Sequence, residues 1–192
     1  MQGSRLTLLR GALTLAALGI AHAHFALVQP PSALANEDGG KGAPPCAEGT
    51  DSNIVTEVQG GHPIAIRLSE FVFHPGHYRI ALSVNSRAEL PPDPDVVQQD
   101  GVSVSASIQN PVRIPVLADG VFAHDTPPTQ DWQTSLTLPN LNCDKCTLQI
   151  IEFMAAHGLD KDGDYSYHHC AVLQIRANPD KPMDTRFPAE KK

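Results

Sequence analysis

The sequence lacks the features that would place the protein on a nucleic acid or in a membrane. Beyond residues 1–23, no apolar stretch approaches the length of about 20 residues that a transmembrane helix needs. Basic residues are scarce there, with 12 Lys and Arg against 21 Asp and Glu, and they form no cluster. Nucleic acids and anionic membranes repel a chain with this charge excess. We therefore expect neutral molecules or cations as partners, no nucleic acid and no membrane anchor.

Long helical patterns are missing as well. Seventeen prolines and fourteen glycines disfavour long helices, and strand-like runs bounded by turn residues dominate the chain. These runs are Phe25–Val28, Ile64–Leu68, Tyr78–Val84, Val102–Ile108, Arg113–Val116, Thr134–Leu138, Thr147–Phe153 and Cys170–Ile175. The pattern predicts an all-β fold, an antiparallel β-sandwich of the immunoglobulin or fibronectin-III-like kind with long surface loops.

Residues 1–23 have the pattern of a secretory signal peptide. Two arginines precede an apolar stretch that ends in the small-x-small site Ala21-His22-Ala23. Cleavage after Ala23 would leave His24 as the first residue, whereas cleavage after Ala21 would leave His22. We expect a secreted or periplasmic protein with one domain over residues 24–177 and a disordered tail over 178–192. The Pro-, Gly- and Ala-rich residues 29–63 predict a long surface loop.

Four cysteines in an exported chain indicate two disulfides, for which three connectivities exist. Cys143 and Cys146 form a Cys-x-x-Cys motif, which fits a zinc half-site, a redox pair or a small local disulfide. A redox pair usually lies in a strand–helix context and a zinc site needs a second pair, so we favour the local disulfide. Cys46–Cys170 is then the long-range disulfide.

Histidines near the start of the domain carry a chemical signal. An N-terminal His24 offers a free amine and an imidazole on one residue, and together these chelate copper. The amine has an unperturbed pKa near 8, so a metal can displace its proton at neutral pH. His74 precedes a Pro-Gly turn, and His77 lies at the start of the strand that follows.

The last strand-like run carries a second cluster of ring side chains. Strand alternation places Tyr165, Tyr167 and His169 on one face, and His168 and Cys170 on the other. A tyrosine can thus face a metal while the neighbouring cysteine forms a disulfide. We interpret His168 as an ordinary strand histidine.

These segments together resemble the lytic polysaccharide monooxygenases, in particular small bacterial single-domain members. His24 follows the signal peptide as in that family. His74 with Gly76 is similar to the His-x-Gly segment that supplies the second copper-binding histidine. Tyr167 to Ala171 is similar to a late aromatic-x-x-Cys stretch, whose aromatic residue lies axial to copper.

The resemblance implies a histidine brace that holds one mononuclear copper ion. Its ligands would be the amine and imidazole of His24 and the imidazole of His74, with Tyr167 at an axial position. Three nitrogen ligands suit copper and leave positions open for oxygen or peroxide. The implied activity is oxidative cleavage of glycosidic bonds in a polysaccharide such as chitin or cellulose. An external electron donor would be needed, and we expect a monomer.

Three more residues are candidates for this site. His77 is the rival of His74 as a ligand, and if His74 binds copper, His77 would lie next to the ligands or face the substrate. His169 shares a face with Tyr167 and is a candidate neighbour of the metal. Glu152 is a charge within an apolar run. It is either an edge-strand residue directed at solvent or a catalytic group, with Tyr167, that orients the oxygen species.

The sequence also departs from the family pattern. One tryptophan and three tyrosines do not make a broad aromatic platform for a crystalline polysaccharide, and Cys170-Ala171-Val172 replaces the usual Cys-Ala-Asp. An alternative function is therefore a non-catalytic secreted copper-binding protein that captures or delivers the metal. The three methionines are few for a Cu(I) carrier. A weaker alternative is a glycan-binding module without redox chemistry.

Overall fold

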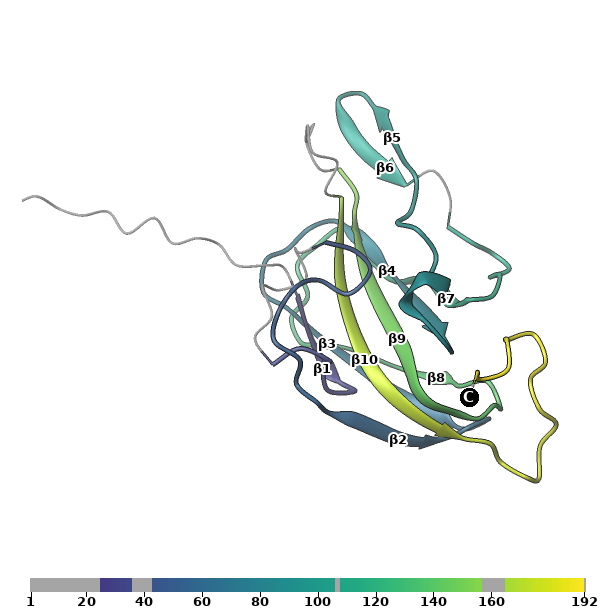
Figure 1. Cartoon of the computed structure of the whole chain (residues 1–192). Helices are drawn as coiled ribbons and strands as arrows, with labels where there is room; N and C mark the ends of the chain where they lie inside the picture. Colours follow the sequence, from purple (N-terminus) through teal and green to yellow (C-terminus); the bar gives the residue numbers. More distant parts are fainter. Residues whose placement is uncertain (1–24, 36–42, 106–107, 157–164, 192) are drawn as a thin grey trace, which may run out of the picture.

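The computed structural model describes residues 25–35, 43–105, 108–156 and 165–191, and their regular secondary structure consists almost entirely of strands (Figure 1). A single 3₁₀ turn, η1, spans Arg87–Glu89. The strands are β1 (Phe25–Gln29), β2 (Val55–Gln59), β3 (Pro63–Glu70), β4 (Gly76–Ser83), β5 (Val96–Gln99), β6 (Val102–Ser105), β7 (Val116–His124), β8 (Trp132–Thr137), β9 (Cys143–Met154) and β10 (Ser166–Arg176). None of the described segments forms a helix long and apolar enough to cross a membrane.

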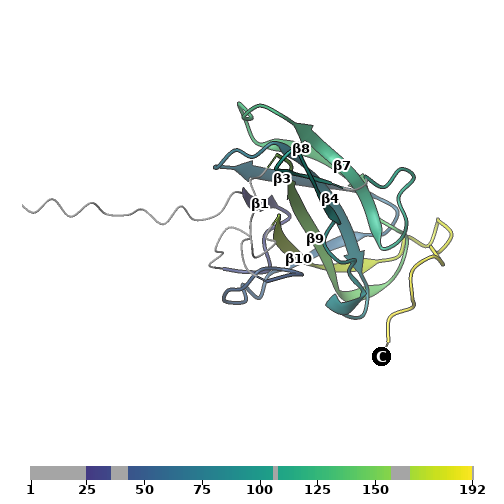
Figure 2. The same cartoon turned by 90° about the horizontal axis from the view of Figure 1, so that it is seen from above.

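Two sheets face each other, which confirms the predicted all-β sandwich (Figure 2). The smaller sheet has the order β1-β3-β8, and the larger has the order β2-β10-β9-β4-β7. Their strand pairs are antiparallel except that β2 runs parallel to β10. A separate hairpin, β5-β6, completes the described strands. The immunoglobulin-like strand arrangement stays a prediction.

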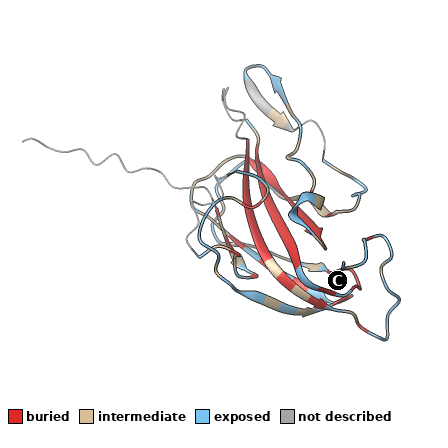
Figure 3. Cartoon of the chain, viewed as in Figure 1, coloured by how far each residue is buried: buried red, intermediate tan, exposed pale blue. Residues whose placement is uncertain are grey.

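Side-chain alternation explains how each sheet packs. In β3, the residues Ile64, Ile66 and Leu68 are buried while their neighbours are exposed, as expected for a strand with one solvated face. Every residue of β4 is buried, because this strand lies inside the larger sheet and both of its faces are covered. Figure 3 shows a similar contrast within the larger sheet, whose inner strands are buried whereas its edge strand β2 is exposed or partly exposed.

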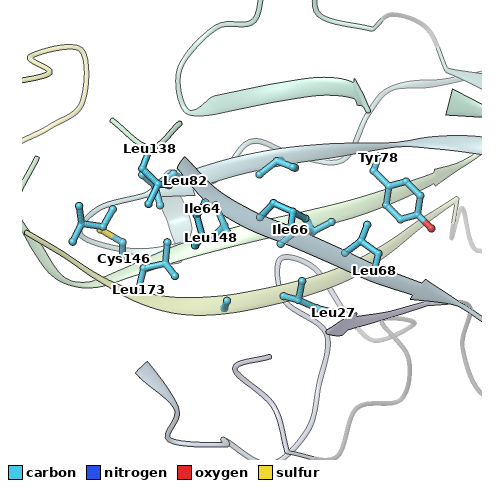
Figure 4. Packing of buried hydrophobic residues seen from close by; sticks show 14 of the residues in the cluster. Leu27, Ile64, Ile66, Leu68, Tyr78, Leu82, Leu138, Cys146, Leu148 and Leu173 are labelled. Atoms are coloured by element: carbon cyan, nitrogen blue, oxygen red, sulfur yellow. The ribbon is translucent and has the colours of Figure 1, made fainter. Parts of the chain in front are cut away.

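The main core fills the space between the two sheets (Figure 4). Leu27 and Leu68 of the smaller sheet pack with Tyr78 near one end of the labelled cluster, and Leu138 and Cys146 lie near the other. The Tyr78 hydroxyl is at the margin of these apolar side chains. This end of the sandwich therefore combines an apolar floor with a polar group.

Both predicted disulfides are present. Cys46 is bonded to Cys170, and Cys143 is bonded to Cys146. The first bond joins the segment after β1 to the outer face of β10, where Ala33, Cys46, Ala81, Leu90 and Cys170 form a small second core. Because Cys143 and Cys146 are bonded to each other, they are neither a zinc half-site nor a free redox pair.

The structure differs from the sequence-based prediction in three strands. The predicted run Arg113–Val116 is wrong, because the chain turns at Ile114 and Pro115 and β7 begins at Val116. Prolines there lack the N–H donor that a sheet ladder requires. β2 forms within the predicted loop 29–63, and its exposed or partly exposed residues show why an apolar pattern did not reveal it. β5 was also missed.

Residues 178–191 are placed against the domain rather than forming the expected disordered tail. The Asn140 side chain accepts a hydrogen bond from the Asn178 backbone N–H and donates to the carbonyls of Asn178, Lys181 and Pro182. Phe187 is buried in the main core. The side-chain amide of Asn140 thus provides hydrogen-bond partners for backbone groups of this irregular segment, which lies outside any helix or sheet.

Candidate functional site

The strand registers bring the predicted site residues to one end of the sandwich. Phe25 of β1 lies opposite Glu70 at the end of β3. Gly76 at the start of β4 lies opposite both His124 of β7 and Met154 of β9. Chain segments far apart in the sequence therefore end in the same place, where side chains from five strands meet.

His74 lies in the short connection between β3 and β4, immediately before this edge. Its backbone N–H donates to Glu70 Oε1 at 3.3 Å. Gly76 follows because a Cβ at that position would lie 2.0 Å from the Phe153 carbonyl oxygen. The close approach of β4 to β9 thus requires a glycine and determines where His74 enters the site.

His74 and Tyr167 form a ring pair in this part of the structure. Their rings are stacked with centroids 6.3 Å apart and an interplanar angle of 28°. Tyr167 is buried on β10 and opposes Glu152 of β9 in the strand register. The imidazole of His74 comes from the connection between β3 and β4, and the phenol of Tyr167 comes from β10. A ligand bound to one ring would therefore lie close to the other ring.

His169 lies one step further along the same face of β10. Its Nε2 is 2.8 Å from the Phe25 carbonyl oxygen, which requires the imidazole to carry its proton on Nε2. Its ring also packs edge-on against the Phe25 ring, with centroids 4.4 Å apart. His169 thus fixes the start of β1, and Phe25 is the residue that follows His24 in the chain. His24 itself lies outside the described residues.

Four side chains that the sequence did not single out complete the site. Glu70 Oε2 accepts hydrogen bonds from Trp132 Nε1 at 2.8 Å and from the Tyr78 hydroxyl at 3.2 Å. His124 Nε2 lies 3.2 Å from the same oxygen. These residues sit at the ends of four different strands, and only the strand register reveals that they meet.

Glu152 is fully buried on the central strand β9 and does not point to solvent. Burial raises the pKa of its carboxyl well above the usual value, and the negative charge of Glu70 raises it further. The polar hydroxyl of Tyr78 opposes this rise in the pKa only in part. The carboxyl is therefore held in its neutral form over a wider pH range than an exposed glutamate.

Burial also raises the pKa of the Tyr78 hydroxyl, with the charges of Glu152 and Glu70 adding to the effect. Tyr78 consequently stays protonated and donates to Glu70 Oε2, while it opposes Glu152 in the strand register. The site thus contains a neutral phenol, a hydrogen-bonded carboxylate and a second carboxyl that favours its proton.

The other candidate histidine, His77, lies on the opposite face of β4. It is buried, its Nε2 is 3.8 Å from Asp119 Oδ1, and its ring packs near Phe153. Burial lowers the pKa of His77, and the Asp119 charge opposes that shift. His168 also faces away from the site, with its Nε2 2.7 Å from Asp93. The structure therefore brings His74, and not His77, to Tyr167.

Two sets of groups at this end have donor atoms for a metal. One is the imidazole of His74, beside the phenol of Tyr167 and the start of β1. The other consists of Glu70, His124 and Glu152, whose ligand atoms lie within 4.8 Å of one another. Phe71, three residues before His74 in the sequence, has an exposed ring.

Comparison with known proteins gives no family for this chain. No family model matches the sequence, and no curated protein sequence matches it.

Proposed function

We propose that the protein is a secreted copper-dependent monooxygenase that oxidatively cleaves glycosidic bonds of a polysaccharide. The proposed ligands are the N-terminal amine and imidazole of His24 and the imidazole of His74, with Tyr167 axial. The observation that carries the proposal is the stacking of His74 on Tyr167 next to Phe25. Phe25, which directly follows His24 in the sequence, is the first described residue and lies at this end of the sandwich.

The donor set fits copper better than it fits a hard cation. Imidazole and amine nitrogens suit copper, and three nitrogens leave coordination positions open. Copper, when bound, would supply a redox centre at which oxygen or peroxide is activated with electrons from an external donor. The chain's own residues would position it: Glu70 holds the His74 backbone, and His169 holds the Phe25 carbonyl.

Buried groups around the proposed ligands would control water and protons. Tyr167 is 4% exposed and Glu152 is 0% exposed, so this side of the site is closed to solvent. With no cation beside it, Glu152 favours the neutral carboxyl, and it lies next to Tyr78 and Tyr167 in the strand register. The exposed Phe71 offers an apolar surface on which a sugar ring can pack.

A non-catalytic copper-binding protein is the second candidate. Among the described residues, Phe71 is the one aromatic side chain with large exposure, which is a small surface for an insoluble polysaccharide and favours capture or delivery of the metal. The two functions share the copper site and differ in turnover. Incubating the copper-loaded protein with chitin or cellulose and a reductant, then analysing the products for oxidised oligosaccharides by mass spectrometry, separates them.

Copper titration of two histidine variants tests the site itself. We expect His74→Ala to weaken Cu²⁺ binding at least tenfold, because it removes a ligand. His77→Ala is the matched control and should bind copper as the parent does, because His77 faces Asp119 on the other side of β4. The reverse ranking would show that the ligand has been assigned to the wrong histidine.

A further inference from the structure

A second group at this end of the sandwich has the composition of a metal site and shares no residue with the proposed copper ligands. Glu70, His124 and Glu152 come from β3, β7 and β9, and their ligand atoms lie within 4.8 Å of one another. We propose that these three residues bind one divalent transition-metal cation and that zinc is the ion that fits them best. The inference does not depend on copper binding.

His124 is oriented as metal-binding histidines are. Its Nδ1 lies 2.7 Å from the Phe122 carbonyl oxygen, and this hydrogen bond requires the proton on Nδ1. In the neutral ring, Nε2 then carries the lone pair, and it faces the Glu70 oxygens at 3.2 and 3.4 Å. Metal-binding histidines commonly donate their second ring N–H to a carbonyl or carboxylate in this way.

The backbone of β7 is distorted where it presents His124. Phe122 has a φ of 52° and Gly120 a φ of 68°, and the pairing of β4 with β7 is irregular along its length. A left-handed conformation is costly for phenylalanine and persists only where surrounding contacts maintain it. With this distortion, the Phe122 carbonyl points toward Nδ1 of His124, two residues later in the chain.

Glu70 is held by donors on its other sides. Trp132 Nε1 donates to Oε2, the Tyr78 hydroxyl donates to the same oxygen, and the His74 backbone N–H donates to Oε1. Tetrahedral zinc with bonds of about 2.0–2.2 Å separates its ligand atoms by about 3.3–3.6 Å. The distances of 3.2 and 3.4 Å from His124 Nε2 to Glu70 are close to that range.

Glu152 supplies the independent sign that a ligand is accommodated here. Its side chain is 0% exposed, and among the described residues neither carboxyl oxygen has a hydrogen-bond donor at ordinary geometry. One of its oxygens lies within 4.8 Å of the ligand atoms of Glu70 and His124. A buried carboxyl without such partners is costly, and a divalent cation would balance two carboxylates beside a neutral imidazole.

The ligand set also indicates which cations are unsuitable. Calcium takes six to eight oxygen ligands, and magnesium keeps several waters in an octahedral shell. A buried set of one nitrogen and two carboxylates instead suits zinc, which binds four ligands and accepts histidine with glutamate. Glu152 needs to approach the other two ligands by a side-chain rotation when the ion binds.

Zinc titration of the processed full chain tests this inference apart from the copper site. The protein is stripped with a chelator, His74→Ala is introduced to remove the proposed copper ligand, and Zn²⁺ is titrated by calorimetry. We expect one equivalent to bind. Adding Glu152→Gln should weaken that binding at least tenfold, while Glu57→Gln, on the exposed face of β2, is the matched control and should not.

Cobalt spectroscopy keeps the test decisive if Glu152→Gln does not fold. Co²⁺ added to the His74→Ala protein should give the intense visible absorption of a four-coordinate site, and His124→Phe should abolish it while retaining an aromatic ring beside Trp132. Absence of zinc and cobalt binding in the folded His74→Ala protein would overturn the inference. So would binding that both Glu152→Gln and His124→Phe leave unchanged.

Discussion

Glu70 connects the separate parts of the candidate site. Its carboxylate accepts hydrogen bonds from an indole, a phenol and the His74 backbone, and it lies against His124. Hydrogen bonds to a charged group contribute roughly 1.5–3 kcal/mol each, and more is lost when a buried partner remains unsatisfied. Glu70 therefore determines both the local stability and the entry of His74 into the site.

The elevated pKa of Glu152 makes stability depend on pH. A glutamate whose folded-state pKa exceeds its unfolded value of 4.5 gives its full contribution below that pH, and the contribution is lost as pH rises toward the folded pKa. Glu152→Gln cannot ionise. We expect the variant to become more stable relative to the parent as pH rises above 4.5, by about 1.4 kcal/mol for each unit of pKa shift.

Urea unfolding between pH 4 and 8, with a chelator present, measures this difference. The chelator is needed because a bound cation would stabilise the ionised parent and hide the effect. Glu57→Gln again serves as the exposed control and should show no such trend. Parallel pH curves for the parent and Glu152→Gln would contradict a raised pKa.

Gly76 is the residue at which the site is least tolerant of change. Gly76→Ala places a Cβ 2.0 Å from the Phe153 carbonyl oxygen, so β4 must move away from β9. We expect a loss of about 2–4 kcal/mol in the free energy of unfolding and weaker copper binding. Gly101→Ala, with a φ of 82° but no atom within 4 Å of the new Cβ, should cost about 1 kcal/mol and leave copper binding unchanged.

Denaturant unfolding and copper titration of the two glycine variants provide the comparison. Equal losses of stability would contradict the requirement for a glycine where β4 approaches β9, because the φ of Gly76 is not in the left-handed region.

At the scale of elements, the two disulfides are expected to contribute unequally. Cys46–Cys170 closes a sequence separation of 124, whereas Cys143–Cys146 closes a separation of 3. Loop-closure entropy predicts that the long-range bond contributes more, by about 2–3 kcal/mol. All four cysteines are buried, so replacing either pair by alanine removes similar packing and the difference reports the cross-links.

Chemical unfolding of the two double-alanine variants tests this expectation. If the loss of the local pair lowers the free energy of unfolding as much as the loss of the long-range pair, the disulfides do not stabilise the fold mainly by lowering the entropy of the unfolded chain.

The strands differ in how far their sequences revealed them. β3 alternates buried and exposed residues, and its pattern predicted the strand. β7 combines a glycine in left-handed conformation with an irregular register, so neither its bounds nor the position of His124 followed from periodicity. Glu70, Trp132 and His124 share no spacing motif. Their meeting depends on strand order, which a single sequence does not contain.

The faces of the ring-bearing residues of β10 could be predicted from the sequence, because strand alternation alone determines which of them share a face. Alternation along β10 placed Tyr167 and His169 on one face, and the structure has them against His74 and Phe25. Glu152 could not be assigned from its sequence context, since a charge in an apolar run fits an edge strand or a central one. The pairing of β9 with both β10 and β4 places it at the centre.

At the scale of the whole molecule, the two ends of the sandwich have different characters. One end gathers His74, Tyr167, Glu70 and Glu152 around the start of β1. At the other, Leu138 and Asn140 line a cavity of about 690 Å³ with residues of the C-terminal segment. Among the described residues, the candidates His74, Tyr167, His169 and Glu152 are thus concentrated at the first end.

The proposed copper brace requires the free amine of His24. The most direct measurement is a Cu²⁺ titration, followed by electron paramagnetic resonance, of the processed chain beginning at His24 and of the same chain with one alanine added before it. We predict tight one-to-one Cu²⁺ binding with a nitrogen-rich axial spectrum for the chain that begins at His24. The chain with the added alanine should lose both. Equal affinity and identical spectra for the two chains would contradict the proposed brace.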